Sequence, residues 1–310
     1  MQRWCVPAYA KINLGLRVRG KRPDGYHELD TYFLQVNLAD ELFFQTTSRE
    51  GMELSCSRSD IPCDDSNLCV RTYNAAARRF GRPARGAARP RRPGIRLHLA
   101  KRIPAGGGLG GGSSDAAVTL MVLDQIWGAS FSRDDLHRIA LEIGSDVPFF
   151  LEGGMCHGAG RGEILSPVPV LPELWIVLVI PDIVISTRWV YQNIKFGLTK
   201  KQKSTTLKSL DPERFDTYSL ISQCQNDLEE GVFAFYPELA RIKARMMAGG
   251  ALVASMTGSG STVFGLFDSL EKGEHVACQF RPDFETHVVR PVKWGGSEIS
   301  EHLLSSSSGW

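Results

Sequence analysis

The sequence lacks the features that most directly place a chain in a membrane or around a metal ion. It has no apolar run of about 18 residues, and its longest dense run, 174–180, has the length of a strand. No two of its seven cysteines are spaced as CxxC, and their number is odd. Neither a zinc site nor a disulfide framework is therefore predicted, and we expect reduced structural thiols.

An excess of charge of either sign is also missing. Lysine and arginine total 36 and aspartate and glutamate 34, so a net charge of +2 favours neither nucleic acid nor an anionic membrane as a partner. Lys11 interrupts the apolar stretch that an export signal would need. We therefore expect a cytoplasmic protein that binds neither nucleic acid nor membrane.

What the sequence does have is the composition of a globular protein, with 43% hydrophobic and 23% charged residues. Its 310 residues exceed what one hydrophobic core usually serves, so we expect two domains with a boundary near residue 155. The last residues are rich in serine and glycine, and 293–310 is expected to be a flexible tail.

Hydrophobic periodicity predicts a mixture of strands and helices. Strands are expected at 12–18, 31–38, 42–47, 95–100, 174–180, 252–256 and 262–267. Helices are expected at 67–80, 116–127, 132–143, 186–195 and 233–248, with Asp65 or Ser66 as the cap of the first and a capping box at Ser132. No internal repeat is found, so the fold class is α/β in the broad sense.

Eight arginines occur between residues 78 and 96, among proline, glycine and alanine. Such a segment is either a basic patch for nucleic acid or a solvated connector. Because the rest of the chain offsets its charge, the sequence favours the connector.

The segment 104–117 contains six glycines in seven positions and then Ser113, Ser114 and Asp115. Glycine lets the backbone approach an anion closely, and the first N–H groups of the following helix have no internal partner. A strand leads into the segment and an apolar helix leads out, which argues against a linker. The pattern predicts a site for a phosphate group at a helix N-terminus.

Two nucleotide-binding types compete for this loop. Gly106, Gly108 and Gly111 match GxGxxG, but a dinucleotide fold needs a second strand after the helix with an acid at its end, and 132–143 is instead helical. A P-loop would need Gly-Lys-Ser/Thr, which does not occur in the segment. The sequence favours a triphosphate-binding loop of another type.

Segments spread from residue 10 to about 265 resemble the motifs of the GHMP small-molecule kinases. The matching segments are Ala10–Leu14, Arg22–Leu29, Asn67–Leu68, the loop at 104–114, Gly144–Phe149, Gly160–Glu163 and Thr257–Gly260. The resemblance implies a two-domain α/β (α+β) fold. Residues 1–155 would form an ATP-binding domain like domain 2 of ribosomal protein S5, and 156–292 a ferredoxin-like domain.

The resemblance also implies two catalytic residues. Asp146 would accept the proton of the substrate hydroxyl, and Lys11 beside it would keep the carboxylate ionised and offset the charge of the phosphoryl group in transfer. Without the resemblance, Asp146 is an ordinary turn residue and Lys11 a side chain that reaches solvent from an apolar strand.

ATP, with Mg²⁺, is the implied phosphoryl donor. The implied nucleotide contacts are Asn67, Lys101, Pro104, Ala105, Gly106, Gly107, Gly108, Leu109, Gly110, Gly111, Gly112, Ser113 and Ser114. The hydroxyls of Ser113 and Ser114 suit either a phosphate or the metal ion.

The implied acceptor is a small alcohol, and its predicted contacts are Asn13, Tyr26, His27, Phe33, Tyr191, Thr257 and Gly258. Tyr26 and Tyr191 would enclose a cytosine ring and His27 would bond its edge, which suits a methylerythritol that carries a cytidine diphosphate group. The alternatives are a homoserine or mevalonate kinase of the same superfamily, a dinucleotide-dependent oxidoreductase and a nucleic-acid binder. The chain is expected to be a monomer or a homodimer.

Overall fold

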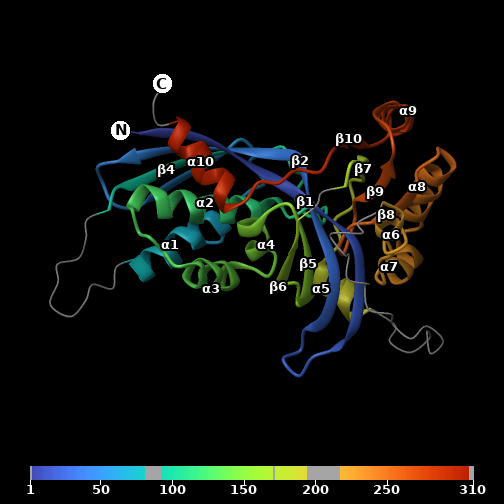
Figure 1. Cartoon of the computed structure of the whole chain (residues 1–310), viewed down its shortest axis with the longest axis horizontal. Helices are drawn as coiled ribbons and strands as arrows, with labels where there is room; N and C mark the ends of the chain where they lie inside the picture. The colour runs from blue at the N-terminus through green and yellow to red at the C-terminus, as the bar shows by residue number, and fades with distance from the viewer. Residues whose placement is uncertain (1, 81–91, 170–171, 194–216, 307–310) are drawn as a thin grey trace.

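A computed structural model of the chain describes residues 2–80, 92–169, 172–193 and 217–306 (Figure 1). Its strands are β1 (Arg3–Lys21), β2 (His27–Thr47), β3 (Met52–Cys56), β4 (Gly94–Ala100), β5 (Met155–Gly160), β6 (Ile164–Val168), β7 (Trp175–Ile180), β8 (Val253–Met256), β9 (Val263–Phe267) and β10 (Glu285–Val289). Its helices are α1 (Leu68–Phe80), α2 (Gly111–Trp127), α3 (Arg133–Ile143), α4 (Val147–Glu152), α5 (Thr187–Gln192), α6 (Thr217–Ile221), α7 (Glu229–Phe235), α8 (Pro237–Ala248), α9 (Leu270–Phe280) and α10 (Gly296–Ser306). None of these helices is long and apolar enough to cross a bilayer.

Strands β1 and β2 form one long antiparallel hairpin, whose pairs run from Arg3–Gln45 to Lys21–His27. The strands expected at 12–18, 31–38 and 42–47 are parts of it. Its register shifts at three places, one of them between Asn13 and Gly15. Such bulges bend and twist a strand, and Figure 1 shows the closed end of the hairpin projecting beyond the neighbouring strands.

The hairpin belongs to a six-stranded sheet of order β3-β4-β2-β5-β6, with β1 paired to β2. Helices α1–α4 cover one face of this sheet (Figure 1). The apolar stretch expected at 116–127 is α2, which begins earlier, at Gly111, and buries residues such as Leu120 against Phe44 and Leu97 of the sheet. The predicted cap of α3 is confirmed, since the Ser132 hydroxyl accepts a hydrogen bond from the Asp135 N–H.

A second, four-stranded antiparallel sheet has the order β10-β7-β9-β8. With helices between β7 and β8, a β8–β9 hairpin, and α9 before β10, this is the ferredoxin-like arrangement that the resemblance implied. Strands β5 and β6, beyond residue 155, pair with the first sheet. The chain therefore changes sheets between Val168 and Trp175, and the domain limits of 155 and 292 stay a prediction.

One apolar cluster joins the two sheets. It contains Ala10 and Ile12 of β1 together with Ile176 and Leu178 of β7 and Phe264 of β9, all buried. Because close-packed side chains transmit strain rather than yield, this cluster fixes the position of β1 relative to the second sheet.

The C-terminal segment returns to the first sheet, and the structure differs here from the expected flexible tail. The Gln35 side chain accepts from the N–H groups of Trp294 and Gly154 and donates to the Trp294 carbonyl. Helix α10 follows and lies beside α2 (Figure 1), burying Ile299 and Leu303. Serine and glycine dominate its sequence, so composition alone hides these few apolar contacts.

The helix expected at 233–248 is two helices, α7 and α8, because Pro237 has no N–H to continue α7 and instead begins α8. The predicted helix at 186–195 is described as α5, and residues 194–216 lie outside the described part of the chain.

The arginine-rich segment is described only at its two ends. Each of its described arginines pairs with a carboxylate, Arg78 with Glu142, Arg79 with Asp135, Arg92 with Glu50 and Arg96 with Glu53. These pairs support the connector interpretation, and residues 81–91 lie outside the described part.

Three buried charged side chains hold the start of α2 against the sheet. The Lys101 ammonium contacts the carboxylates of Asp40 and Asp115, and 5% or less of each side chain is exposed. Asp40 also accepts from the N–H groups of Arg102 and Ile103 at 2.6 and 2.8 Å. Burial and the Asp40 carboxylate raise the pKa of Asp115 to about 7, whereas Lys101 opposes this shift. The lysine is thus the only cation in direct contact with two buried acids among the described residues.

We predict that Lys101→Met lowers the free energy of unfolding by about 3–5 kcal/mol, because it leaves buried carboxylates without their cation. Lys272→Met is the matched control, since Lys272 pairs with Asp268 at the surface and its loss should cost less than about 1 kcal/mol. Chemical denaturation of both variants measures the difference. Equal losses would show that the buried triad does not stabilise the fold.

Candidate active site

A cavity of about 830 Å³ opens between the two sheets. On the side of the first sheet it is lined by the hairpin and by the residues just before α4. On the side of the second sheet it is lined by α5 and by the loop after β8. Of the predicted site residues, Lys11, Asn13, Tyr26, His27, Phe33, Gly108, Gly110, Asp146, Tyr191 and Gly258 line it. The two predicted catalytic residues therefore line one cavity together with all the predicted acceptor contacts except Thr257, which is buried.

Lys11 and Asp146 form an ion pair within this cavity, with 3.4 Å between Nζ and Oδ2. The lysine is 4% exposed, and its Nζ also donates to Asn13 Oδ1 at 2.7 Å. Asn13 in turn donates to Thr31 Oγ1 at 2.9 Å. A buried ammonium requires such partners, and they fix its position.

The local fold explains this meeting. Lys11 and Asn13 lie two residues apart on β1, so their side chains point to the same face of the strand. Asp146 directly precedes α4, and its side chain makes no capping bond to that helix. One carboxylate oxygen therefore faces Lys11, and about a third of the side chain remains accessible from the cavity.

The glycine loop before α2 passes close to both residues. Gly106, Gly108 and Gly110 have φ values of 79°, 77° and 73°. At Gly108, a Cβ would lie 2.7 Å from the Thr257 carbonyl oxygen, and at Gly110 it would lie 2.9 Å from the Phe150 ring. These positions therefore accept only glycine without rearrangement.

The backbone of this loop has N–H groups that are available as hydrogen-bond donors. None of the N–H groups from Gly106 to Gly110 donates to another described residue. Leu109 anchors the loop instead, because its side chain is 1% exposed in the core and its carbonyl accepts from the Lys11 N–H at 2.9 Å. The loop thus presents free amides beside the ion pair, which suits an anion.

The remaining predicted nucleotide residues lie outside the lining of this cavity. Pro104, Ala105, Gly106, Gly107, Leu109, Gly111, Gly112, Ser113 and Ser114 continue the loop into α2. The Asn67 side chain accepts from the Cys69 N–H and donates to the Pro62 carbonyl, so Asn67 rather than Asp65 or Ser66 satisfies the start of α1. Lys101 is engaged in the buried triad.

Aromatic residues form the opposite end of the cavity. Tyr26 is 54% exposed at the hairpin turn, and the His27 and Tyr191 rings are stacked at 5.0 Å between centroids and 18° between planes. Burial, with a smaller effect of Lys21, lowers the pKa of His27, so its imidazole is neutral at pH 7. Burial and the charge of Asp146 raise the pKa of Tyr191, which keeps its hydroxyl protonated. This end is aromatic, and the charged residues that line it are Lys21, Asp24, Arg161 and Arg188.

Three cavity-lining cations escaped the sequence-based prediction. The Arg161 guanidinium lies 4.8 Å from the centre of the Tyr26 ring, and Lys21 and Arg188 line the same cavity. Arg161 belongs to the matching segment at 160–163, which was the signal available for it. Arg188 precedes Tyr191 by three positions, so the two lie on neighbouring positions of one helical face of α5.

Phe33 and Thr257 complete the contacts around the ion pair. The Phe33 ring is 3% exposed, and its centre lies 5.5 Å from Lys11 Nζ. The Thr257 hydroxyl is fully buried and accepts from the Asn13 N–H at 2.9 Å. Two neighbouring N–H groups of β1, those of Lys11 and Asn13, therefore bind the glycine loop and the 257–260 loop respectively.

No group of three or more acidic, histidine or cysteine side chains is placed to hold a metal ion among the described residues. Near the ion pair the cavity is lined by Asp146 and by the hydroxyl residues Thr31, Ser145 and Ser259, whereas Ser113 and Ser114 lie in the first turn of α2, outside the lining.

The comparisons identify two matching family models. The model described as the GHMP kinases N terminal domain matches residues 67–154, and that described as GHMP kinases C terminal matches residues 205–285. A protein of Prosthecochloris aestuarii named 4-diphosphocytidyl-2-C-methyl-D-erythritol kinase is 44% identical over 292 residues, which cover 93% of this chain and 98% of that protein. A protein of the same name from Chlorobium phaeobacteroides (strain BS1) is 41% identical over 94% of this chain and 98% of its own length.

Solved structures agree with these matches. The crystal structure of a 4-(cytidine 5'-diphospho)-2C-methyl-D-erythritol kinase has a TM-score of 0.71 at 32% identity, covering 93% of this chain and 99% of that one. A homoserine kinase from Cytophaga hutchinsonii reaches a TM-score of 0.70 at 19% identity, with 96% of both chains covered, and so shares the fold alone. The chain belongs to the GHMP kinase family, among relatives named 4-diphosphocytidyl-2-C-methyl-D-erythritol kinase.

Proposed function

We propose that this chain transfers the γ-phosphoryl group of ATP to the 2-hydroxyl of 4-diphosphocytidyl-2-C-methyl-D-erythritol, giving the 2-phosphate and ADP in the non-mevalonate isoprenoid pathway. The observation that carries the proposal is the Lys11–Asp146 ion pair in a cavity whose far end is aromatic. The ion pair suits phosphoryl transfer to a hydroxyl, and the aromatic end suits the cytosine ring of the acceptor.

Asp146 is the proposed general base. Its carboxylate accepts the proton of the acceptor hydroxyl as the oxygen attacks the γ-phosphorus, and the bond from that phosphorus to the β-γ bridging oxygen breaks. Lys11 holds the carboxylate in place and faces the negative charge of the phosphoryl group in transfer. Asn13 positions the Lys11 ammonium.

The glycine loop is the proposed phosphate site. Its free N–H groups and the N-terminus of α2 would receive the β- and γ-phosphates next to the ion pair. Mg²⁺ usually keeps several waters and binds only one or two protein oxygens beside the phosphates. A site with few protein donors, and without a cluster of acidic side chains among the described residues, is compatible with this coordination. The hydroxyls of Ser113 and Ser114 in the first turn of α2 would hold it, and when bound it would offset charge on the phosphates.

The aromatic end is the proposed cytosine site. Tyr26 and Tyr191 supply π-faces for stacking, and the neutral His27 can accept or donate a hydrogen bond to the base edge. Lys21, Arg161 and Arg188 supply positive charge near the path of the diphosphate. A homoserine or mevalonate kinase would have no use for these features, because those substrates carry neither a base nor a diphosphate.

The oxidoreductase alternative is wrong for this fold. After the glycine loop and α2 the chain continues into α3 and α4, and the next strand, β5, pairs antiparallel with β2. A dinucleotide site requires parallel strands joined by the helix.

We expect ADP release from ATP and Mg²⁺ to require the cytidine diphosphate substrate, in a coupled assay run beside homoserine and mevalonate. Asp146→Asn should lower kcat by about 10²–10⁴-fold with a small change in the KM for ATP, because it removes the base and keeps the size of the side chain. Asp134→Asn on the outer surface of α3 is the matched control. Turnover of homoserine or mevalonate alone would refute the substrate, and near-normal kcat in Asp146→Asn would refute the base.

The neutral state of His27 predicts the pH dependence of acceptor binding. Since burial lowers the pKa of His27 below its ordinary value, the imidazole is neutral near pH 7, and acidification through the lowered pKa adds a proton that removes its acceptor nitrogen. The KM for the cytidine substrate should therefore be flat near neutrality and rise as the pH falls through that pKa. His27→Gln should lose this rise, whereas His275→Gln on α9 should keep it. An unchanged acid limb in His27→Gln would assign the effect to another group.

A further inference from the structure

A buried asparagine outside the cavity holds one of the loops that form it. Asn226 is 7% exposed, and its amide nitrogen donates to the carbonyls of Met256 and Gly258, both at 2.7 Å. Its Oδ1 accepts from the Leu228 N–H at 2.9 Å. Both amide hydrogens and the amide oxygen are therefore used, which a side chain of another type cannot reproduce.

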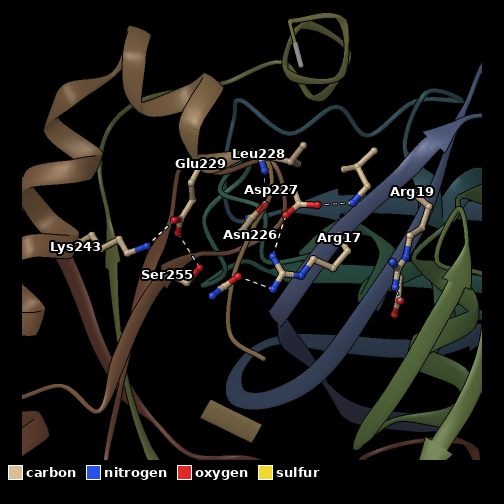
Figure 2. A network of polar contacts seen from close by, with 11 residues as sticks. Arg17, Arg19, Asn226, Asp227, Leu228, Glu229, Lys243 and Ser255 are labelled. Carbon is tan, nitrogen blue, oxygen red and sulfur yellow. Dashed lines mark hydrogen bonds and ion pairs between the residues drawn. The ribbon is translucent and has the colours of Figure 1, made fainter. Parts of the chain in front are cut away.

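The residues on either side of Asn226 bind β1 (Figure 2). The Leu16 N–H donates to the Gln225 carbonyl, and the Asp227 N–H donates to the Leu16 carbonyl. The Asp227 carboxylate accepts from the Val18 N–H at 2.9 Å and pairs with Arg17 at 3.0 Å. The turn at 225–227 is thus fixed to the strand that carries Lys11 and Asn13.

Glu229 extends the same turn toward β8. Its carboxylate accepts from the Ser255 hydroxyl and the Met256 N–H, both at 2.7 Å, and pairs with Lys243 of α8 at 2.5 Å. Figure 2 shows these contacts on the side of the turn that faces away from Arg17. Asn226 and Glu229 together hold the strand end that leads into the 257–260 loop.

That loop lines the cavity at Gly258 and Ser259. Neither of their N–H groups donates to another described residue, whereas the Gly258 carbonyl is bound by Asn226. The loop lies between β1 and the glycine loop, since a Cβ on Gly258 would be 3.2 Å from Asn13 Oδ1 and one on Gly108 would be 2.7 Å from the Thr257 carbonyl oxygen. A shift of the loop would therefore move Asn13 or the glycine loop with it.

We infer that Asn226 is a positioning residue for the phosphoryl transfer. By binding the Met256 and Gly258 carbonyls, it fixes the loop whose residues Gly258 and Ser259 line the cavity and whose Thr257 hydroxyl binds Asn13. Asn226 itself is not among the residues that line the cavity. The expected loss of turnover rests on the proposed function. The statement that Asn226 fixes the 256–258 segment rests on its hydrogen bonds alone.

The test compares Asn226→Asp with Arg17→Met in the full-length chain. A carboxylate at 226 keeps the size of the side chain but faces two carbonyl oxygens without a hydrogen to donate, so the loop should shift. Arg17→Met removes the ion pair with Asp227 and the hydrogen bond to the Gln225 side chain, and it leaves the three Asn226 bonds in place. If Asn226→Asp does not fold by circular dichroism, Asn226→Ser, which is uncharged, replaces it.

We expect kcat to fall about 100-fold in the Asn226 variant, because a displacement near 1 Å at the reacting groups has that effect, while the KM for ATP changes far less. Arg17→Met should change kcat by less than about fivefold, the value of an exposed ion pair. Hydrogen exchange of the peptide spanning 254–262 should become faster in the Asn226 variant and stay unchanged in Arg17→Met.

Two results would overturn the inference. One is a folded Asn226 variant whose exchange at 254–262 matches that of the wild type. The other is a kcat lowered no more than in Arg17→Met. A wild-type chain that releases no ADP with the cytidine diphosphate substrate would refute the proposed function instead, and the exchange measurement would still decide whether Asn226 fixes the loop.

Discussion

The site depends on the ion pair between Lys11 and Asp146, and that pair depends on β1. A lysine that is 4% exposed is costly unless its charge is compensated, and Asp146 and Asn13 compensate it. The backbone of the same strand bonds Leu109 in the glycine loop, and the Asn13 N–H bonds Thr257 in the second loop. One strand therefore sets the spacing between the groups that bind phosphate and the group that accepts a proton.

The two sheets contribute unequal parts of the cavity, and neither forms it alone. The hairpin supplies Tyr26 and His27, whereas α5 of the second sheet supplies Tyr191, which stacks on His27. The buried cluster of β1, β7 and β9 residues fixes the sheets against each other. Hydrogen bonds from the 225–227 turn to Leu16 and Val18 of β1 add a polar contact to this packing.

The sequence correctly predicted the helices and strands that are specified by neighbouring residues, through hydrophobic periodicity or capping. The alternation at 95–100, the Ser132 cap and the apolar run at 174–180 correspond to β4, α3 and β7. Strands β5 and β6 were missed because they are short and contain glycine or proline. Their strand character comes from the pairing of β5 with β2 and of β6 with β5. Helix α10 was missed because its contacts are with α2 and β1, far away in the sequence.

The same distinction separates the predicted site residues. Motif resemblance led to Lys11, Asp146 and the glycine loop, and the structure brings these together. The resemblance did not predict that Lys101 contacts Asp40 and Asp115, because these three buried side chains are brought together only by the tertiary fold. Both lysines next to the loop are thus neutralised by carboxylates, while the loop N–H groups have no acceptor among the described residues. The first groups to bind a ligand with several negative charges would therefore be the N–H dipoles of the loop, whose direction is fixed by the conformation of its glycines. Such fixed dipoles do not have to reorient when the negative charge moves during phosphoryl transfer.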